Sequence, residues 1–411
     1  MNIRPEILAP AGDRERLEAA VRFGADAVYL GGERFGMRAS PANFNRESLP
    51  GAVEYAHAHG VKVYLTCNTL PRNQELSELP EFLINARRAS VDALILSDIG
   101  VLMQAKQIVP ELEIHISTQA GIVNYASANA FYELGARRVV LARELSLAEI
   151  KEIRDNTPPD LEIEAFVHGA MCMSFSGRCL LSNYIVGRDA NRGECAQPCR
   201  WGYHLMEEKR PGQFFPVYED EKGSYILNAK DLCMIEHIDD LCKAGITSFK
   251  IEGRAKSSYY VSVVVNAYRC AVDHFLRSEG EFVLSSWIRE EVDKVSHRRY
   301  CTGFFYGPID NGQYYENGGY ERQYDVAAVV TSYRDGRLVC SQRNKIEKGD
   351  VLEVLEPGKP PFSLTAQALY DEAGQLIENT CHAQMTFELE SAREAVPGAI
   401  IRKEKEQGSQ R

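Results

Sequence analysis

The sequence predicts a closed (β/α)8 barrel of the TIM type, followed by a small all-β domain. Two observations support this prediction. Short strand-like runs alternate with amphipathic helical stretches over residues 1–280, and near Gln323 the pattern changes to short runs separated by glycine-bearing turns. Strands that alternate with helices indicate parallel strands joined by crossover helices, and eight such units suit a closed barrel. An open doubly wound sheet is the alternative, but no GxGxxG fingerprint follows the first strand.

The eight predicted strands are short runs rich in β-branched and other apolar residues. Helical patterns such as RERLEAAVRFGA and LPEFLINARRAS separate most of them. Several of these patterns close on glycine just before the next strand, as helix C-termini commonly do. The predicted strands begin at Glu6, Asp26, Lys62, Asp92, Glu113, Arg138, Glu162 and Ser248.

The predicted barrel domain spans residues 1–320 and has one long interruption, between the seventh and eighth strands. This cysteine-rich insertion, at about residues 169–247, is far longer than an ordinary βα loop. Long insertions at this face of a barrel are commonly functional. Within it, residues 225–227 are predicted to form a return strand that leads into a helix near Cys233.

Residues 321–403 are expected to form a small β-barrel or sandwich. Runs such as DVAAVVTSY, RLVCSQR and DVLEVLEP are separated by DG, GD and GK turns, which is typical of short antiparallel strands. The run NKIEKGDVLEVLEP resembles barrel modules of translation factors. We therefore expect this domain either to contact RNA or to serve as a lid or dimerisation module. Residues 404–411 are predicted to be a disordered tail.

Composition restricts the class of protein. The chain has 411 residues, 45% of them hydrophobic and 26% charged, as in ordinary globular proteins. No apolar run approaches the roughly 20 residues that cross a bilayer, and the start MNIRPEILAPAG has no signal-peptide pattern. We therefore expect a cytoplasmic protein without a membrane partner. The net charge of −11 argues against non-specific coating of nucleic acid, although Arg87–Arg88, Arg137–Arg138 and Arg298–Arg299 are candidate basic patches.

Polar residues follow six of the predicted strands at their C-terminal ends, where the chemistry of a (β/α)8 barrel takes place. They predict a polar pocket, although single polar residues at such positions also serve as helix caps, as Asp98 and Ser146 are expected to do. The candidates for proton transfer are His168, Glu144 and Glu252. The candidates for binding the substrate, a small dianionic metabolite, are Arg143, Gln119, Asn68, Lys250 and Arg254.

Five of the eleven cysteines lie in the insertion, among glycines. They are Cys172, Cys179, Cys195, Cys199 and Cys233. In the cytoplasm, clustered thiols favour metal or redox chemistry over structural disulfides. No CxxC pair is present, so zinc ribbons and fingers fit poorly. Iron–sulfur clusters accept wider spacing, and the alternative is a set of buried, reduced cysteines.

A [4Fe–4S] cluster requires four ligands, whereas five candidates are present. Cys172, Cys179 and Cys195 are each flanked by glycine-containing turns and are the first choice. The fourth ligand is predicted to be Cys233, because a helix start there would favour a thiolate. Cys199, which follows Pro198, is the alternative fourth ligand.

Several long motifs carry a resemblance to a known family. The runs EAFVHGAMCMSFSGRCLLS, NRGECAQPCRWGY, LNAKDLCMI and SFKIEGRAKSSYYV resemble the collagenase-like peptidase family U32, as does the opening EILAPAGDRERLEAAVRFGADAVYLGG. Within the family, the chain is most similar to bacterial tRNA hydroxylation proteins that make 5-hydroxyuridine at the wobble position. This resemblance implies tRNA as a partner, dependence on an iron–sulfur cluster, and prephenate as a source for the hydroxyl group.

Two other functions stay open. Proteolysis is implied by the family name, but the chain has no HExxH motif and no GxSxG elbow. A cysteine protease needs one activated thiolate with a histidine base, and His168 stands four residues before Cys172. The other alternative is a cluster-bearing subunit that acts only with a paralogous partner chain.

Overall fold

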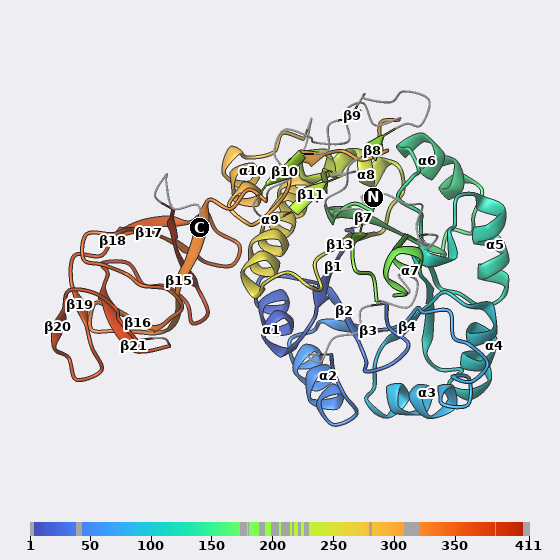
Figure 1. The fold of residues 1–411 in the computed structure, drawn as a ribbon, viewed down its shortest axis with the longest axis horizontal. Coiled ribbons are helices and arrows are strands. Elements are labelled where there is room, and N and C mark those ends of the chain that lie inside the picture. Colours follow the sequence, from blue (N-terminus) through green and yellow to red (C-terminus); the bar gives the residue numbers. More distant parts are fainter. Residues whose placement is uncertain are drawn as a thin grey trace.

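A ring of strands surrounded by helices forms the larger part of the molecule, and a separate β-rich domain lies beside it (Figure 1). The computed structural model describes residues 4–37, 43–172, 179, 181–188, 194–198, 230–278, 282–307, 320–382 and 384–405, with four short strands between residues 205 and 225.

Eight parallel strands close into a barrel. Each pairs with the next along the chain, and the eighth, β13, pairs with both β7 and β1. The strands are β1 (Glu6–Ala11), β2 (Ala27–Gly31), β3 (Lys62–Cys67), β4 (Ala93–Leu96), β5 (Glu113–Ile116), β6 (Arg138–Val140), β7 (Glu162–Ala170) and β13 (Ser248–Ile251). The predicted (β/α)8 barrel is therefore confirmed, and its eight strands are those that the sequence indicates.

Helices cover the outside of the barrel and bury their apolar sides against it (Figure 1). Asp98 and Ser146 accept hydrogen bonds from the first turns of α4 and α6, which confirms both predicted caps. The helices are α1 (Arg14–Arg22), α2 (Ser48–Ala58), α3 (Leu79–Arg88), α4 (Ile99–Ile108), α5 (Tyr125–Glu133), α6 (Leu147–Asp155), α8 (Ile238–Lys243), α9 (Ser258–Arg277) and α10 (Ser286–Asp293). In the described part of the chain, no helix is long and apolar enough to span a membrane.

The insertion between β7 and β13 adds β12 (Asp231–Cys233) to the sheet, where it pairs antiparallel with β7. A strand from beyond α10, β14 (Tyr300–Cys301), pairs in turn with β12. The other elements of the insertion are α7 (Leu181–Val186), β8 (Leu205–Met206), β9 (Phe214–Phe215), β10 (Tyr218–Asp220) and β11 (Gly223–Tyr225).

The return strand lies further along the chain than predicted, which corrects the placement of Cys233. This residue ends β12 and does not begin a helix; a 3-10 turn at Ile235–His237 follows it, and α8 comes next. The strand forms there because Asp231 is fixed on two sides. Its backbone pairs with Ala170, and its buried carboxylate lies 2.7 Å from the Arg298 guanidinium.

The C-terminal domain is a single antiparallel sheet of eight strands around its own apolar core, in the order β18-β17-β22-β15-β16-β21-β19-β20. This confirms the predicted small all-β domain. Its strands are β15 (Tyr324–Arg334), β16 (Arg337–Gln342), β17 (Val351–Leu355), β18 (Phe362–Thr365), β19 (Leu369–Tyr370), β20 (Leu376–Ile377), β21 (Thr386–Glu390) and β22 (Ile400–Glu404). Residues 406–411 of the predicted tail lie outside the described residues.

Buried ion pairs join the two domains. The fully buried Arg402 of β22 lies 2.5 Å from Glu291 of α10 and 2.7 Å from Glu353 of β17. Lys294, which follows α10, contacts Glu353 from the other side at 2.9 Å. Since these charges are removed from water, the contact depends on all of its members being present.

Candidate active site

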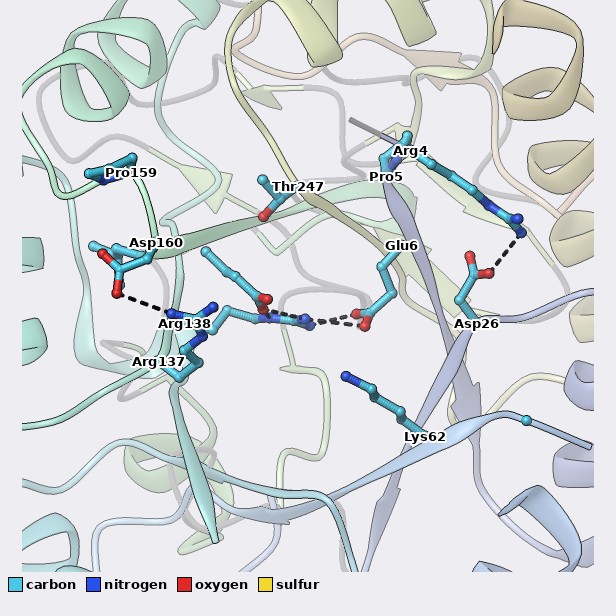
Figure 2. Close-up of a pocket in the computed structure, with 13 residues that line it drawn as sticks. Arg4, Pro5, Glu6, Asp26, Lys62, Arg137, Arg138, Pro159, Asp160 and Thr247 are labelled. Carbon is cyan, nitrogen blue, oxygen red and sulfur yellow. Dashed lines mark hydrogen bonds and ion pairs between the residues drawn. The ribbon is translucent and has the colours of Figure 1, made fainter. Parts of the chain in front are cut away.

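A pocket opens at the N-terminal ends of the barrel strands, opposite to the predicted site. It has a volume of about 430 Å³ and is lined by side chains of both signs (Figure 2). Arg138 points toward Glu6 across the pocket, Arg137 lies against Asp160, and Arg4 lies against Asp26. The pocket therefore leads into a charged barrel interior, which the sequence analysis did not anticipate.

The charges behind this pocket satisfy one another. The buried Arg138 guanidinium lies 2.6 Å from Glu6, 2.7 Å from Glu162 and 3.0 Å from Glu164. Burial alone would raise the pKa of Glu6, but Arg138 outweighs it, and the pKa is lowered. Because these groups already have their partners, this end of the barrel has little unmet capacity to bind a ligand, and its polar residues stabilise the fold.

Lys250 belongs to the same interior network. Its ammonium lies 2.6 Å from Glu164 and over the ring of Tyr29 at 4.7 Å. Burial would raise the pKa of Glu164, but Lys250 and Arg138 lower it. The structure thus places this predicted substrate-binding residue inside the barrel, where its ammonium is paired with Glu164.

Arg143 lies at the C-terminal mouth of the barrel and has a hydrogen-bond donor without an acceptor among the described residues. Arg143 donates to the carbonyl oxygen of Ala170 at 2.9 Å, stacks on Phe166 at 3.9 Å and lies 3.6 Å from Glu252. Its Nε is buried and has no hydrogen-bond partner among the described residues. A buried donor of this kind costs free energy until an acceptor meets it, so Arg143 is suited to bind an anionic ligand.

Arg254 occupies the opposite side of the mouth. Its guanidinium donates to Asn43 at 3.2 Å and to Thr66 at 3.4 Å. It packs so tightly on Gly31 that a Cβ there would lie 2.6 Å from its nitrogen. This close approach requires glycine at the end of β2.

The remaining predicted rim residues bind the loops of the mouth together. Asn68 accepts a hydrogen bond from the backbone of Met37 and donates to Ser117. Gln119 lies half-buried in a 3-10 turn after β5, and Glu144 lies half-buried after β6. The structure thus brings Arg143 and Glu252 into contact and distributes the others around the mouth.

His168 lies apart from that pair. A bulge in the pairing of β7 with β13 precedes it, and its buried ring contacts Tyr260 and Tyr268 of α9 and Tyr300 of β14. Neither ring nitrogen has a hydrogen-bond partner in the described part of the chain. Burial lowers the pKa of His168 to about 3, with a smaller contribution from nearby cations, so the ring is neutral near pH 7. Its role in proton transfer stays a prediction.

The predicted cluster ligands are only partly described. Cys172 is exposed just beyond β7, Cys179 and Cys195 are half-buried, and Cys233 pairs with His168 across the ladder. Cys199 lies outside the described residues. No three His, Cys, Asp or Glu side chains within the described ranges lie close enough to hold a metal ion.

Two contacts within the insertion are compatible with a thiolate site. The buried Ser182 hydroxyl accepts a hydrogen bond from the Ala196 backbone at 3.0 Å, which brings together the segments that carry Cys179 and Cys195. The backbone N–H of Gln197 donates to the Cys195 sulfur at 3.4 Å. Hydrogen bonds of this kind to sulfur are common around iron–sulfur clusters.

Comparison with known proteins decides the family. The model of peptidase family U32 matches residues 12–313, and the model of the family's C-terminal domain matches residues 322–402. The chain belongs to peptidase family U32.

Curated U32 relatives carry two kinds of name. A Bacillus subtilis relative named tRNA hydroxylation protein P1 is 37% identical over 98% of this chain and 95% of its own length. An Escherichia coli relative named tRNA hydroxylation protein P is 38% identical over 88% of each chain. A Methanocaldococcus jannaschii relative named as an uncharacterized protease is 42% identical over 86% of this chain and 84% of its own.

Proposed function

We propose that this U32 protein takes part in the hydroxylation of tRNA, forming 5-hydroxyuridine at the wobble position. The observation that carries the proposal is the similarity to the Bacillus subtilis tRNA hydroxylation protein, which extends over both domains and nearly the full length of both chains. A function shared along the whole length is better supported than one that rests on the barrel alone, because barrels of this type host many chemistries.

The mouth of the barrel is the proposed active site. Arg143 offers a buried, unpaired N–H to a carboxylate, and Glu252 lies beside it at 3.6 Å. A small dianionic metabolite such as prephenate would accept a hydrogen bond from Arg143. The ion pair between Arg143 and Glu252 would then be lost, and the Glu252 carboxylate would be free. Glu252 would then be placed to exchange a proton with the bound substrate.

We further propose that thiolates of the insertion hold an iron–sulfur cluster. Cys172, Cys179 and Cys195 would supply three ligands, and Cys233 or Cys199 the fourth. A [4Fe–4S] cluster, when bound, supplies electron transfer or a Lewis-acidic iron. The residues of this chain would contribute the N–H donor of Gln197 to sulfur and the Ser182 contact that orders the Cys195 segment.

A deletion strain tests the proposal most directly. Mass spectrometry of wobble nucleosides should show loss of 5-hydroxyuridine and its restoration by the wild-type chain, but not by Cys172→Ala. Cys381→Ala is the matched control, since Cys381 is exposed in the C-terminal domain, away from the insertion. Unchanged wobble uridines in the deletion strain, after redundant pathways are removed, would contradict the function. Anaerobically purified protein without iron and acid-labile sulfide would contradict the cluster.

Proteolysis is the second candidate, favoured by the Methanocaldococcus jannaschii relative named as a protease. His168 is buried among three tyrosines, whereas Cys172 is exposed, and no hydrogen bond joins the two among the described residues; this weakens a cysteine-protease arrangement. Hydrolysis of gelatin or collagen by the purified chain, abolished by Cys172→Ala, would favour this candidate.

A further inference from the structure

A second pocket lies beside the mouth of the barrel and is unlike the charged pocket at the other end. It has a volume of about 400 Å³, within the range of ordinary ligand pockets. Three phenylalanines line it: Phe35 and Phe44 from the β2–α2 connection, and Phe82 from α3. Phe35 and Phe82 meet edge to face with their ring centroids 5.2 Å apart. The aromatic side chains therefore form a preformed wall rather than a loose apolar surface.

The backbone holds this wall in an uncommon conformation. Phe35 has a φ of 60°, in the left-handed region that residues other than glycine seldom adopt. The Phe35 carbonyl accepts a hydrogen bond from Thr69 at 3.0 Å, and the Phe44 backbone N–H donates to Gly31 at 3.1 Å. Both contacts attach the aromatic residues to the ends of barrel strands. Strain that the surroundings fix in this way is typical of ligand sites.

The polar groups of the pocket suit a neutral heterocycle. Asn85 of α3 lines the pocket half-buried, and its side chain makes no hydrogen bond within the described residues. Its amide offers both a donor and an acceptor. Arg34 and Arg46 stand at the rim, but each is paired with a carboxylate, Glu78 and Glu81. A lining of both charge signs disfavours a bare phosphate and is compatible with a nucleobase.

The rim arginines can still reach a nucleic-acid backbone. The Arg46–Glu81 pair is 62% and 72% exposed, and exposed ion pairs contribute little free energy. An arginine in such a pair can exchange its carboxylate for a phosphate at small cost. A nucleotide could therefore place its base in the pocket and its phosphate beside the arginines of the rim.

The pocket is also close to the proposed active site. Asn43 donates to the carbonyl of Gly32, which lines the pocket, and accepts from Arg254, which lies in the mouth. Asn43 thus bridges a residue of the pocket and a residue of the mouth. A nucleotide next to the one that enters the mouth would therefore be placed to reach the pocket.

We infer that this pocket is a subsite for an unpaired nucleobase that flanks the target uridine. The base packs against Phe82, the half-buried member of the phenylalanine wall, and hydrogen-bonds through its edge to Asn85. Aromatic stacking and edge recognition are the general means by which proteins select single-stranded RNA. The inference rests on the proposed function, because it takes the substrate to be RNA whose target base enters the mouth.

A cycle of protein and RNA changes tests the inference. The probe is a synthetic anticodon stem-loop with a wobble uridine, compared with two versions that carry an abasic nucleotide directly 5′ or 3′ of it. The proteins are wild type, Phe82→Leu, Asn85→Ala and the control Phe362→Leu, which changes a partly buried phenylalanine of the C-terminal domain. Fluorescence anisotropy gives each Kd, and thermal unfolding confirms that each variant is folded.

For wild type, one abasic stem-loop should bind on the order of 10-fold more weakly than the intact one, the usual range for one stacked base. Phe82→Leu should weaken the intact stem-loop to a similar extent, with no further loss for that abasic RNA. Asn85→Ala should show the same pattern with a smaller loss, and Phe362→Leu should behave as wild type. Abasic and protein effects that multiply, or abasic RNAs that bind as the intact one does, would overturn the subsite alone. Absence of any stem-loop binding by wild type would overturn the subsite and the RNA substrate together.

Discussion

The two ends of the barrel carry similar residues in opposite states. At the N-terminal end, Arg138 contacts three carboxylates, and Lys250 contacts one of them. At the C-terminal mouth, Arg143 has one carboxylate neighbour, Glu252 at 3.6 Å, and a buried N–H without a partner in the described structure. The first arrangement has its charges matched, and the second leaves a site for an acceptor.

The two ends therefore differ in how far their charged groups are matched. The pocket at the N-terminal end leads to the ion pairs of Arg138, in which each charged group has a partner. Charges that are mutually paired stabilise the barrel, whereas a buried donor without an acceptor is destabilising until an acceptor binds to it. Substitutions at the two ends should therefore separate stability from activity.

Removing the central arginine of the N-terminal network should have the largest effect. Arg138→Met leaves Glu6 without its main cation and leaves Glu164 with Lys250 alone. Breaking a buried ion pair in this way typically costs about 3–5 kcal/mol. Urea denaturation of the purified protein measures the free energy of unfolding.

The neighbouring arginine supplies the control. Arg137 makes an exposed pair with Asp160, so Arg137→Met should lower the free energy of unfolding by less than about 1 kcal/mol. Similar losses in the two variants would mean that the interior network is not the source of stability, and the contrast between the barrel ends would fail.

Arg143→Lys should lower activity and leave stability nearly unchanged, the reverse of what is expected for Arg138→Met. Lysine lacks the guanidinium fork, so it cannot both hold the Ala170 carbonyl and offer a second N–H to a ligand. Modification of the wobble uridine in the complemented deletion strain should fall on the order of 10- to 100-fold, since a hydrogen bond to a charged group contributes about 1.5–3 kcal/mol. The urea midpoint should stay close to that of wild type. A large stability loss with normal modification would place Arg143 with the structural residues.

The barrel could be predicted because its strands and several of its helix caps are encoded by local sequence patterns. Asp98 and Ser146 cap their helices through hydrogen bonds to residues three positions away, and such signals survive without tertiary information. Cys233 shows the limit of this reasoning. Its strand exists because Asp231 meets Ala170 and Arg298, which are distant in sequence. No local pattern reports those contacts.

The candidate site could be predicted by position but not by environment. The rim residues were found because the strand ends face one mouth. Their contacts were not predicted: Lys250 pairs with Glu164 inside the barrel, whereas Arg254 donates to Asn43 at the mouth. The bulge that precedes His168 changes its surroundings to the tyrosines of α9. Glu6 and Glu164 were missed, and Arg138 was placed in a candidate basic patch although it is buried, because charged residues near strand starts are usually exposed. Only closure of the barrel buries them together.

The smallest effect expected from the comparison is a pH dependence of stability at the N-terminal end. His115 of β5 is buried against the ring of Tyr64. Burial, and then the charge of Arg138, lower the pKa of His115 below its ordinary value of 6.5. As the pH falls below 6.5, the unfolded chain therefore gains a proton at this position before the folded chain does. The folded state should lose stability as the pH falls below 6.5, by at most about 1.4 kcal/mol per pH unit for this group.

His115→Gln should flatten that slope, because glutamine has no proton to gain in this range. His382→Gln, a change at an exposed position of the C-terminal domain, should leave it unaltered. Urea unfolding at several pH values between 4.5 and 7 measures both slopes. The carboxylates Glu6 and Glu164, whose pKa values are lowered by folding, contribute to the slope near pH 4.5 in both proteins, so the effect of His115 is the difference between the wild-type and His115→Gln slopes. An unchanged slope in His115→Gln would show that the histidine takes up its proton inside the barrel, and the interior would then be less completely paired than its contacts indicate.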